Sequence, residues 1–427
     1  MIPMPLIGRI IFLLLIVLIQ WYFFQAIETI SKNYGDFARK IFRNIYFFIS
    51  AFMILSAFAA LLFPFQLWPR AIRLSIGSLL FVVFICQFLG ILFLIPDDII
   101  RFFRWIFSFF IKESTSAKND NSISRLKFFS YLAVAAAAIP GMGLLYGLFR
   151  GGYDYRVHRV KLSFPNLPDA FDGFKIVQLS DIHTGSFISP APLKRAFQLA
   201  LDQKPDAIFF TGDLVNDLPE ETIGFESAFS MLRAPHGVYS IFGNHDYAEY
   251  LYHDEDQRHL RIEAQENLKK VHANAGWKLL MNEHTYLEKN GQKIGLIGVE
   301  NWDAKKRFSK HGNMRNAIQG MEEVSFKILL SHSPSHWDEV IRKQYTDIDI
   351  TFSGHTHGMQ LGIEIPGLKW SPVKYLYRQW AGLYQDGKQY LYVNRGLGFI
   401  GFNGRLGIWP EITVVELTKS KNKNEQA

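Results

Sequence analysis

Five short segments in the second half of the sequence contain residue types that bind metals. Their seven candidate ligands are Asp181, His183, Asp213, Asn244, His332, His355 and His357. Carboxylate, amide and imidazole groups bind hard or borderline divalent ions, and seven of them are too many for one tetrahedral ion. They suit two ions such as Mn²⁺, Fe²⁺ or Zn²⁺. A pair of ions about 3.5–4 Å apart can clamp a phosphoryl group and activate a water for in-line attack.

Each of these segments directly follows a short, β-rich run, so strands must position the ligands. The runs are 175–179, 207–211, 238–242, 326–330 and 348–352. Strand ends that converge on one edge of a sheet are where α/β folds place their sites. Residues i and i+2 of an extended chain point the same way. Asp181 with His183, and His355 with His357, are therefore expected to reach the same centre.

The rest of the second half continues this alternation. Helices are predicted at 190–203 and within 254–275, a hairpin at Asn290-Gly291, and late strands at 390–393 and 412–417. The pattern predicts one globular α/β domain over 152–420, a two-sheet sandwich flanked by helices. A polar tail is predicted at 421–427. Six histidines match none of the five segments and are expected at the surface: His236, His253, His259, His272, His284 and His311.

Charge and cysteine content exclude several classes of protein. Residues 1–150 carry 14 Lys+Arg and 6 Asp+Glu, a net of +8, whereas the remainder carries 32 and 33, a net of −1. The candidate site therefore lies in a part of the chain without a phosphate-tracking basic surface, which makes nucleic acid an unfavoured partner. The single cysteine, Cys86, excludes a disulfide framework and a cysteine-based metal site.

The first third of the sequence has the composition of a membrane anchor. Four stretches contain no charged residue, at 10–27, 44–69, 74–96 and 128–149. Each is close to the roughly 20 apolar residues that cross a bilayer, so the sequence predicts a bundle of four transmembrane helices within residues 1–150. The absence of ionisable residues from these runs favours an anchor over a transporter. The membrane bilayer is accordingly a predicted partner.

Two features of this region remain open. Arg101 and Arg104 lie among Phe and Ile near 98–111, where the spacing indicates an interfacial helix or an extension of the third span. Lys and Arg are more numerous in the first and third connections than in the second, which places the second half of the chain outside the cytoplasm. The basic residues from Arg150 to Lys161 favour the opposite orientation.

The five segments together carry a resemblance to a known family. The motifs Asp181-Ile-His183, Gly212-Asp213, Gly243-Asn244-His245-Asp246, Ser331-His332 and Gly354-His355-Thr356-His357 occur in the order found in calcineurin-like metallophosphoesterases. With the apolar first third, the chain resembles their transmembrane subfamily. The resemblance extends over about 152–420, and it departs from the family pattern at Met359, where related sequences often have a glycine.

The resemblance implies a role for each residue. Asp181, His183 and His357 would hold one metal ion, Asn244, His332 and His355 the second, and Asp213 would bridge them. His245 would face the phosphate and protonate the leaving oxygen or stabilise charge there. Asp246 would orient that imidazole, although a helix N-cap role is an equal alternative.

The implied activity is hydrolysis of a phosphodiester or pyrophosphate. Some relatives cleave UDP-2,3-diacylglucosamine in lipid A biosynthesis, which makes a lipid-linked substrate the leading expectation. That substrate faces the cytosol, so it conflicts with the orientation favoured by the charges. The alternative is a non-catalytic metal-binding interaction or sensor module on a membrane anchor.

Two further groups could contact a substrate. Arg395 and Arg405 lie in Gly-rich loops and are candidate phosphate contacts, with ordinary salt bridges as the alternative. Aromatic and basic residues alternate over 369–384, where they could form a lip touching lipid or substrate, or belong to the core.

Overall fold

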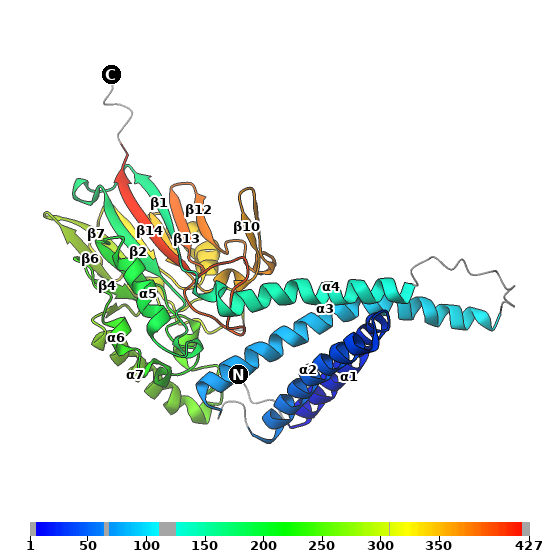
Figure 1. Ribbon diagram of the computed structural model, residues 1–427. Coiled ribbons are helices and arrows are strands. Elements are labelled where there is room, and N and C mark those ends of the chain that lie inside the picture. The colour runs from blue at the N-terminus through cyan, green and yellow to red at the C-terminus, as the bar shows by residue number, and fades with distance from the viewer. Residues whose placement is uncertain (1–5, 64–67, 111–124, 307, 421–427) are drawn as a thin grey trace. The chain divides into compact units, whose positions relative to one another are not determined.

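The computed structural model describes residues 6–63, 68–110, 125–306 and 308–420 (Figure 1). The chain divides between Tyr146 and Gly147 into two compact units. The predicted polar tail at 421–427 lies outside the described residues. The two units are treated separately below.

The N-terminal unit contains four long apolar helices. They are α1 (Leu6–Ser31), α2 (Asp36–Leu62), α3 (Arg70–Ser108) and α4 (Arg125–Phe149). Each is long and apolar enough to cross a membrane, which confirms the prediction of a multi-pass membrane protein. The segment predicted as a separate interfacial helix near 98–111 instead continues α3 up to Ser108. The structure thus shows the extension of the third span, and the helix continues through Pro96, which lies between the two parts.

Polar side chains connect the first three helices inside this unit. Gln20 of α1 and Gln87 of α3 exchange two amide hydrogen bonds of 2.6 and 2.8 Å, and Ser50 of α2 donates to the Gln20 side chain over 2.7 Å. All three side chains are buried. Gly90 of α3 allows close approach, since a Cβ there would lie 2.3 Å from the Phe23 ring. Small residues and buried amides of this kind hold transmembrane helices together.

The C-terminal unit is built on two six-stranded mixed sheets. The first has the spatial order β1 (Arg156–Phe164), β14 (Glu411–Lys419), β2 (Phe174–Leu179), β3 (Ala207–Phe210), β4 (Val238–Ser240) and β5 (Lys278–Leu279). The second has the order β12 (Gly382–Asp386), β13 (Gln389–Val393), β9 (Ile350–Ser353), β8 (Lys327–Leu330), β7 (Gln292–Gly298) and β6 (Glu283–Lys289). Strands β2 to β5 are parallel, as are β13, β9, β8 and β7.

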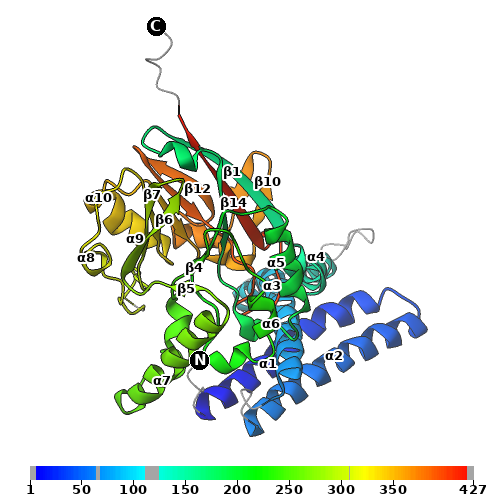
Figure 2. The same ribbon diagram turned by 90° about the vertical axis from the view of Figure 1, so that its left-hand side faces the viewer.

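The sheets pack face to face, and helices cover their outer faces (Figure 2). Fully buried side chains of β3 and β8, including Phe209 and Ile328, belong to the cluster between the sheets. The helices α5 (Ala191–Leu201), α6 (Glu226–Phe229) and α7 (Arg258–Asn274) pack on the first sheet. The short helices α8 (Met314–Ala317), α9 (Pro334–His336) and α10 (Arg342–Gln344) lie beside the second. The predicted two-sheet sandwich flanked by helices is confirmed.

Two details differ from the sequence-based expectations. His272 is fully buried on the inner side of α7, against Phe210, Phe242 and Trp277, and is not at the surface. A separate two-stranded hairpin, β10 (Ile363–Ile365) and β11 (Leu368–Trp370), projects from the segment after the last predicted ligand.

Candidate metal centre

The predicted ligands come together at the carboxyl ends of strands from both sheets. Asp181, Asp213 and Asn244 follow β2, β3 and β4 of the first sheet, and His332 and His355 follow β8 and β9 of the second. The sandwich therefore brings loops from its two sheets to one place, which no single sheet edge would do.

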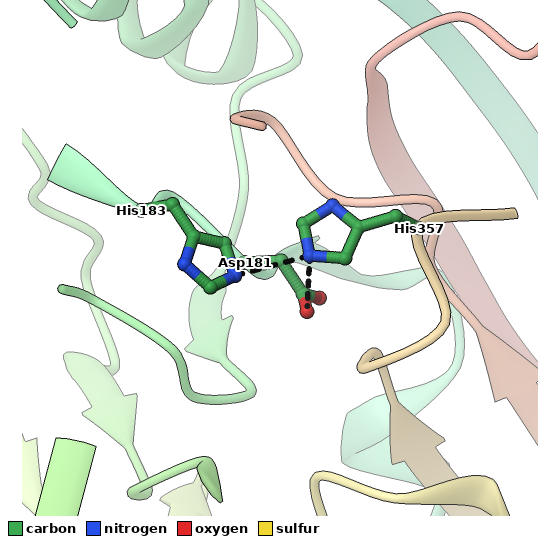
Figure 3. Close-up of side chains that lie close together, drawn as sticks. All are labelled: Asp181, His183 and His357. Carbon is green, nitrogen blue, oxygen red and sulfur yellow. Dashed lines mark hydrogen bonds and ion pairs between the residues drawn. The ribbon is translucent and has the colours of Figure 1, made fainter. Parts of the chain in front are cut away.

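One group of ligand atoms consists of Asp181, His183 and His357, shown in Figure 3. The Nε2 atom of His357 lies 3.2 Å from Asp181 Oδ1 and 3.0 Å from His183 Nε2. The three side chains are buried, and ligand atoms of all three lie within 4.8 Å of one another. A single ion can contact all of them at ordinary coordination distances.

A second group consists of Asp213, His332 and His355. His332 Nε2 lies 3.1 Å from Asp213 Oδ2 and 3.3 Å from His355 Nδ1. The same Asp213 oxygen lies 3.5 Å from His183 Nε2 of the first group. Asp213 thus stands between the two groups, as a bridging carboxylate must.

Several buried polar atoms in the ligand groups lack a suitable hydrogen-bond donor within the described part of the chain and are placed as metal ligands would be. The Nε2 atoms of His183 and His357 face each other at 3.0 Å, although two neutral imidazoles can share at most one proton there. Asn244 Oδ1 is buried and has no hydrogen-bond partner among the described residues, while its Nδ2 donates to the Tyr250 hydroxyl over 2.9 Å. A carbonyl oxygen in this state is a ready ligand, so the donor set fits two divalent ions.

The ligand loops adopt an unusual backbone conformation. Asp181, His183, Asp213, His355 and His357 all have positive φ, between 48° and 72°. Left-handed backbone costs a residue with a side chain about 1–2 kcal/mol and is typical of functional loops. Neighbouring glycines make room for the carboxylates, since a Cβ on Gly243 would lie 2.2 Å from Asp213 Oδ1.

Burial and neighbouring charges set the ionisation of the ligands. Burial opposes the charge of Asp213, but the charges of His332 and His245 hold its pKa well below the ordinary value. Burial likewise lowers the pKa of His332, yet the Asp213 and Asp181 carboxylates raise it to about 10. Burial, followed by the charge of His332, lowers the pKa of His355 to about 3. Asp213 is therefore anionic and His355 neutral, which are the forms that bind metals, whereas His332 must lose its proton to act as a ligand.

His245 lies beside the ligands but has a different environment. Its ring lies 4.8 Å from that of His183, and its Nδ1 donates to the Asn216 carbonyl over 2.6 Å. A carbonyl oxygen can only accept, so Nδ1 carries a proton and Nε2 remains to meet a substrate. The Asn216 carbonyl thus takes the orienting role that was expected of Asp246.

The structure places Asp246 in the alternative, capping position. Its carboxylate accepts hydrogen bonds from the backbone N–H groups of Gly243, Asp213, Leu214 and Val215 at 2.8–3.3 Å. It therefore ties the loop after β3 to the loop after β4. The expectation that Asp246 orients His245 is corrected, because its oxygens are directed at backbone amides.

Sequence reasoning missed a polar group behind His355. The Nε2 atom of His355 lies 2.7 Å from the Tyr377 hydroxyl and 3.3 Å from Asp303 Oδ2. Asp303 is fully buried and also accepts hydrogen bonds from the Ser333 hydroxyl and the Lys305 amide. A carboxylate behind a metal-binding histidine is a common arrangement. No motif in the sequence marks Asp303, which lies in an irregular loop.

The two arginine candidates do not meet the expectation of phosphate contacts. Arg395 is buried and forms ion pairs with Glu364 and Glu411. Arg405 is fully buried, donates to the Gly398 carbonyl over 2.7 Å and lies 3.4 Å from His357 Nδ1. Their guanidinium groups are held by protein groups, so the salt-bridge alternative applies to Arg395, and Arg405 supports the loop of His357.

A cavity of about 490 Å³ opens beside the ligand groups. Its lining combines the ligands Asp213, Asn244, His355 and His357, and also His245, with apolar side chains that include Met359, Leu376 and Ile400. A phosphoryl group can therefore reach the ligands from a partly apolar opening.

Comparison with known families matches both units of the chain. Residues 5–152 match the family described as "Probable Calcineurin-like phosphoesterase, transmembrane domain". Residues 174–359 match the family described as "Calcineurin-like phosphoesterase". The second range contains all seven predicted ligands.

Individual relatives are similar to more than half of the chain. The metallophosphoesterase YkuE of Bacillus subtilis is 31% identical over 270 residues, which are 62% of this chain and 85% of the relative. The phosphodiesterase YaeI of Escherichia coli is 28% identical over 299 residues, 69% of this chain and 99% of the relative. The UDP-2,3-diacylglucosamine pyrophosphatase LpxG of Chlamydia trachomatis is 26% identical over 289 residues, 57% of this chain and 83% of the relative.

Proposed function

This chain belongs to the calcineurin-like metallophosphoesterases that carry an N-terminal four-helix transmembrane domain, and on that premise we propose that it hydrolyses phosphodiester or pyrophosphate bonds with two metal ions. The observation that carries the proposal is the position of Asp213 Oδ2, 3.5 Å from His183 Nε2 and 3.1 Å from His332 Nε2. One carboxylate shared by two buried ligand groups is the arrangement that a dinuclear centre needs.

The proposed ligands divide into two sets around that carboxylate. Asp181, His183 and His357 would hold one ion, Asn244, His332 and His355 would hold the other, and Asp213 would be shared by both. Mn²⁺, Fe²⁺ and Zn²⁺ all suit this set of oxygen and nitrogen donors. Two bound ions supply charge neutralisation at the phosphoryl oxygens and a nucleophilic water.

The side chains around the ligands perform the remaining tasks. His245, held by the Asn216 carbonyl, presents Nε2 toward the cavity, and only the imidazolium form of the ring, with protons on both nitrogens, would pass a proton from Nε2 to the leaving oxygen. Asp303 and Tyr377 hold the ring of His355, and Arg405 holds the loop of His357. Asp246 keeps the loops of Asp213 and Asn244 in register through their backbone amides.

The proposed substrate is lipid-linked, with UDP-2,3-diacylglucosamine as the leading candidate. The four spanning helices keep the enzyme at the bilayer, and the similar relative LpxG carries that substrate in its name. The substrate requires a domain that faces the cytosol, which the basic residues after α4 favour. If the domain faces outward, as the other loop charges predict, phosphoesters of the envelope or cell wall take its place.

The test uses the full-length protein in a detergent-free nanodisc. We expect Mn²⁺-dependent hydrolysis of bis-p-nitrophenyl phosphate that is abolished in Asp213→Ala and retained in Asp256→Ala, an exposed aspartate in the loop before α7. UDP-2,3-diacylglucosamine is assayed in parallel by release of UMP.

The outcomes separate the candidate activities. Turnover of the diester that depends on Asp213 supports a phosphodiesterase, and turnover of the sugar nucleotide alone supports a dedicated pyrophosphatase. A folded protein that holds two metal ions and turns over neither substrate would contradict the proposal and favour a non-catalytic module.

A further inference from the structure

Exposed apolar side chains in the C-terminal unit are concentrated in one segment. Of the thirteen large apolar side chains that are exposed among the described residues from 147 to 420, nine lie between 359 and 400. We call these nine the apolar rim: Met359, Leu361, Ile363, Ile365, Leu368, Tyr375, Leu376, Leu383 and Ile400. Single exposed apolar residues are ordinary, but a concentration of this size marks a binding surface.

The apolar rim continues directly from the candidate metal centre. Met359, Leu376 and Ile400 line the same cavity as Asp213 and His355, and they are 50%, 54% and 37% exposed. Met359 is two residues beyond the proposed ligand His357. A molecule with its phosphate at the ligands therefore has apolar side chains within the same opening.

The backbone at Met359 points to a role for its side chain. Its φ of 55° lies in the left-handed region, which glycine adopts without strain. A side chain there strains the backbone. The thioether is half exposed at the cavity, so burial in the protein core does not offset that strain. Contact with an apolar ligand would offset it.

The β10–β11 hairpin extends the rim away from the cavity. It belongs to neither six-stranded sheet, and it exposes Ile363, Ile365 and Leu368. An ion pair between Glu364 and Arg395 fixes the base of the hairpin. Gly362 lies so close to the Trp370 carbonyl there that a side chain at this position would clash with it. An isolated hairpin is marginal in water, so this anchored one presents its apolar side chains in a defined place.

The charges of the segment indicate what the rim binds. Residues 359–400 contain four exposed basic side chains, Lys369, Lys374, Arg378 and Lys388, against the acidic side chains Glu364 and Asp386; the fifth basic residue, Arg395, is buried and ion-paired. Both acidic groups are ion-paired, Glu364 with Arg395 and Asp386 with Arg342. Apolar side chains interspersed with an excess of positive charge complement an anionic lipid rather than a neutral protein surface.

We propose that the apolar rim binds the hydrocarbon chain of a lipid phosphoester whose phosphate lies at the candidate metal centre. The inference rests on the proposed phosphoesterase function and its lipid-linked substrate, and it adds the side chains that select the hydrocarbon chain. Met359 and Leu376 contact the part of the chain nearest the phosphate, and the hairpin receives the part farther away.

The test compares two phosphonates that differ only in chain length. Methylphosphonate and decylphosphonate are bound to the full-length, Mn²⁺-loaded protein in amphipol, and each Kd is measured by calorimetry. Burial of one methylene strengthens binding about fourfold, so burial of three or four gives a preference of about 100-fold for decylphosphonate. The variants Met359→Gly and Leu376→Ser are each expected to reduce this preference by about four- to tenfold.

The matched control is Ile262→Ser on α7, where a side chain of equal exposure, 50%, lies outside the cavity lining. Met359→Gly relieves backbone strain, so loss of the preference there is not a folding defect. The proposal is overturned if wild-type protein binds both phosphonates equally well. It is also overturned if both rim variants keep the wild-type preference for decylphosphonate, or if the control loses as much of that preference as they do. The phosphonates are not hydrolysed, so their Kd values test lipid binding by the apolar rim even if the turnover assay fails. Turnover without a preference for the longer chain would refute the role of the apolar rim and leave the proposed phosphoesterase function intact.

Discussion

Asp303 offers a sharp test of how the centre holds its second ion. In Asp303→Asn the fold of the loop is retained, but an amide replaces the carboxylate oxygen that lies 3.3 Å from His355 Nε2 and 3.2 Å from the Tyr377 hydroxyl. Hydrogen bonds to a charged group contribute about 1.5–3 kcal/mol, which corresponds to roughly 10- to 100-fold in affinity. We expect the ion at His332 and His355 to bind that much more weakly, and the ion at Asp181 to be unaffected.

The measurement is the Mn²⁺ content at graded free Mn²⁺ after equilibrium dialysis, read by elemental mass spectrometry. Wild-type protein should fill both sites together, whereas Asp303→Asn should show one tight and one weakened site. The matched control is Asp349→Asn, a half-buried aspartate that accepts hydrogen bonds from Asn166 and the Lys327 amide away from the ligands. If Asp303→Asn weakens both ions equally, or neither, the assignment of Asp303 to His355 is refuted.

Two further predictions concern stability. Burial lowers the pKa of His272 to about 3, from a value near 6.5 in the unfolded chain. The free energy of unfolding therefore decreases as the pH falls through 6.5, by about 2 kcal/mol between pH 8 and pH 5. His272→Phe should melt slightly below wild type at pH 8, because the Ser240 hydroxyl loses its 2.9 Å partner, and it should melt above wild type at pH 5. The control variant His259→Gln, at an exposed position, should leave the melting temperature unchanged at both pH values. Parallel pH profiles for His272→Phe and wild type would contradict the argument. In the membrane unit, Gln20→Leu should lower stability by about 1–2 kcal/mol in detergent melts, since it leaves the Gln87 amide without its two bonds, and Gln20→Leu/Gln87→Leu should recover most of the loss. A double variant that is less stable than the single one would show that the two amides act independently.

The sequence predicted that the candidate ligands would lie close together, because they follow strand ends. A buried parallel strand is a short apolar run that can be recognised locally, and the polar residue that follows it must lie at the sheet edge. Asp181, Asp213 and His332 were therefore predictable from their positions alone. The spans were equally predictable, because length and apolarity are sufficient for a transmembrane helix.

The features that were missed depend on contacts between distant segments. Asp303 reaches His355 from an irregular loop, and Arg405 reaches the carbonyl groups of Gly396 and Gly398 from the end of the domain. His272 was predicted at the surface because the helix that contains it is rich in charged residues, and the composition of a helix does not show which single position is buried. Strand β1 was missed because its basic residues alternate with apolar ones at the edge of the sheet, and its nine residues pair with β14 from the far end of the chain.

The left-handed backbone of the ligand loops bears on the order in which this domain assembles. Asp181 and the backbone amide of His355 are 174 residues apart in the sequence, yet they are hydrogen-bonded at 2.9 Å in the finished site. Such loops cannot hold their shape until both sheets have formed, because only the surrounding structure offsets their strain. In small zinc domains the ion organises an unfolded chain. Here the ligand loops depend on two folded sheets, so we expect ion capture to follow folding rather than to guide it.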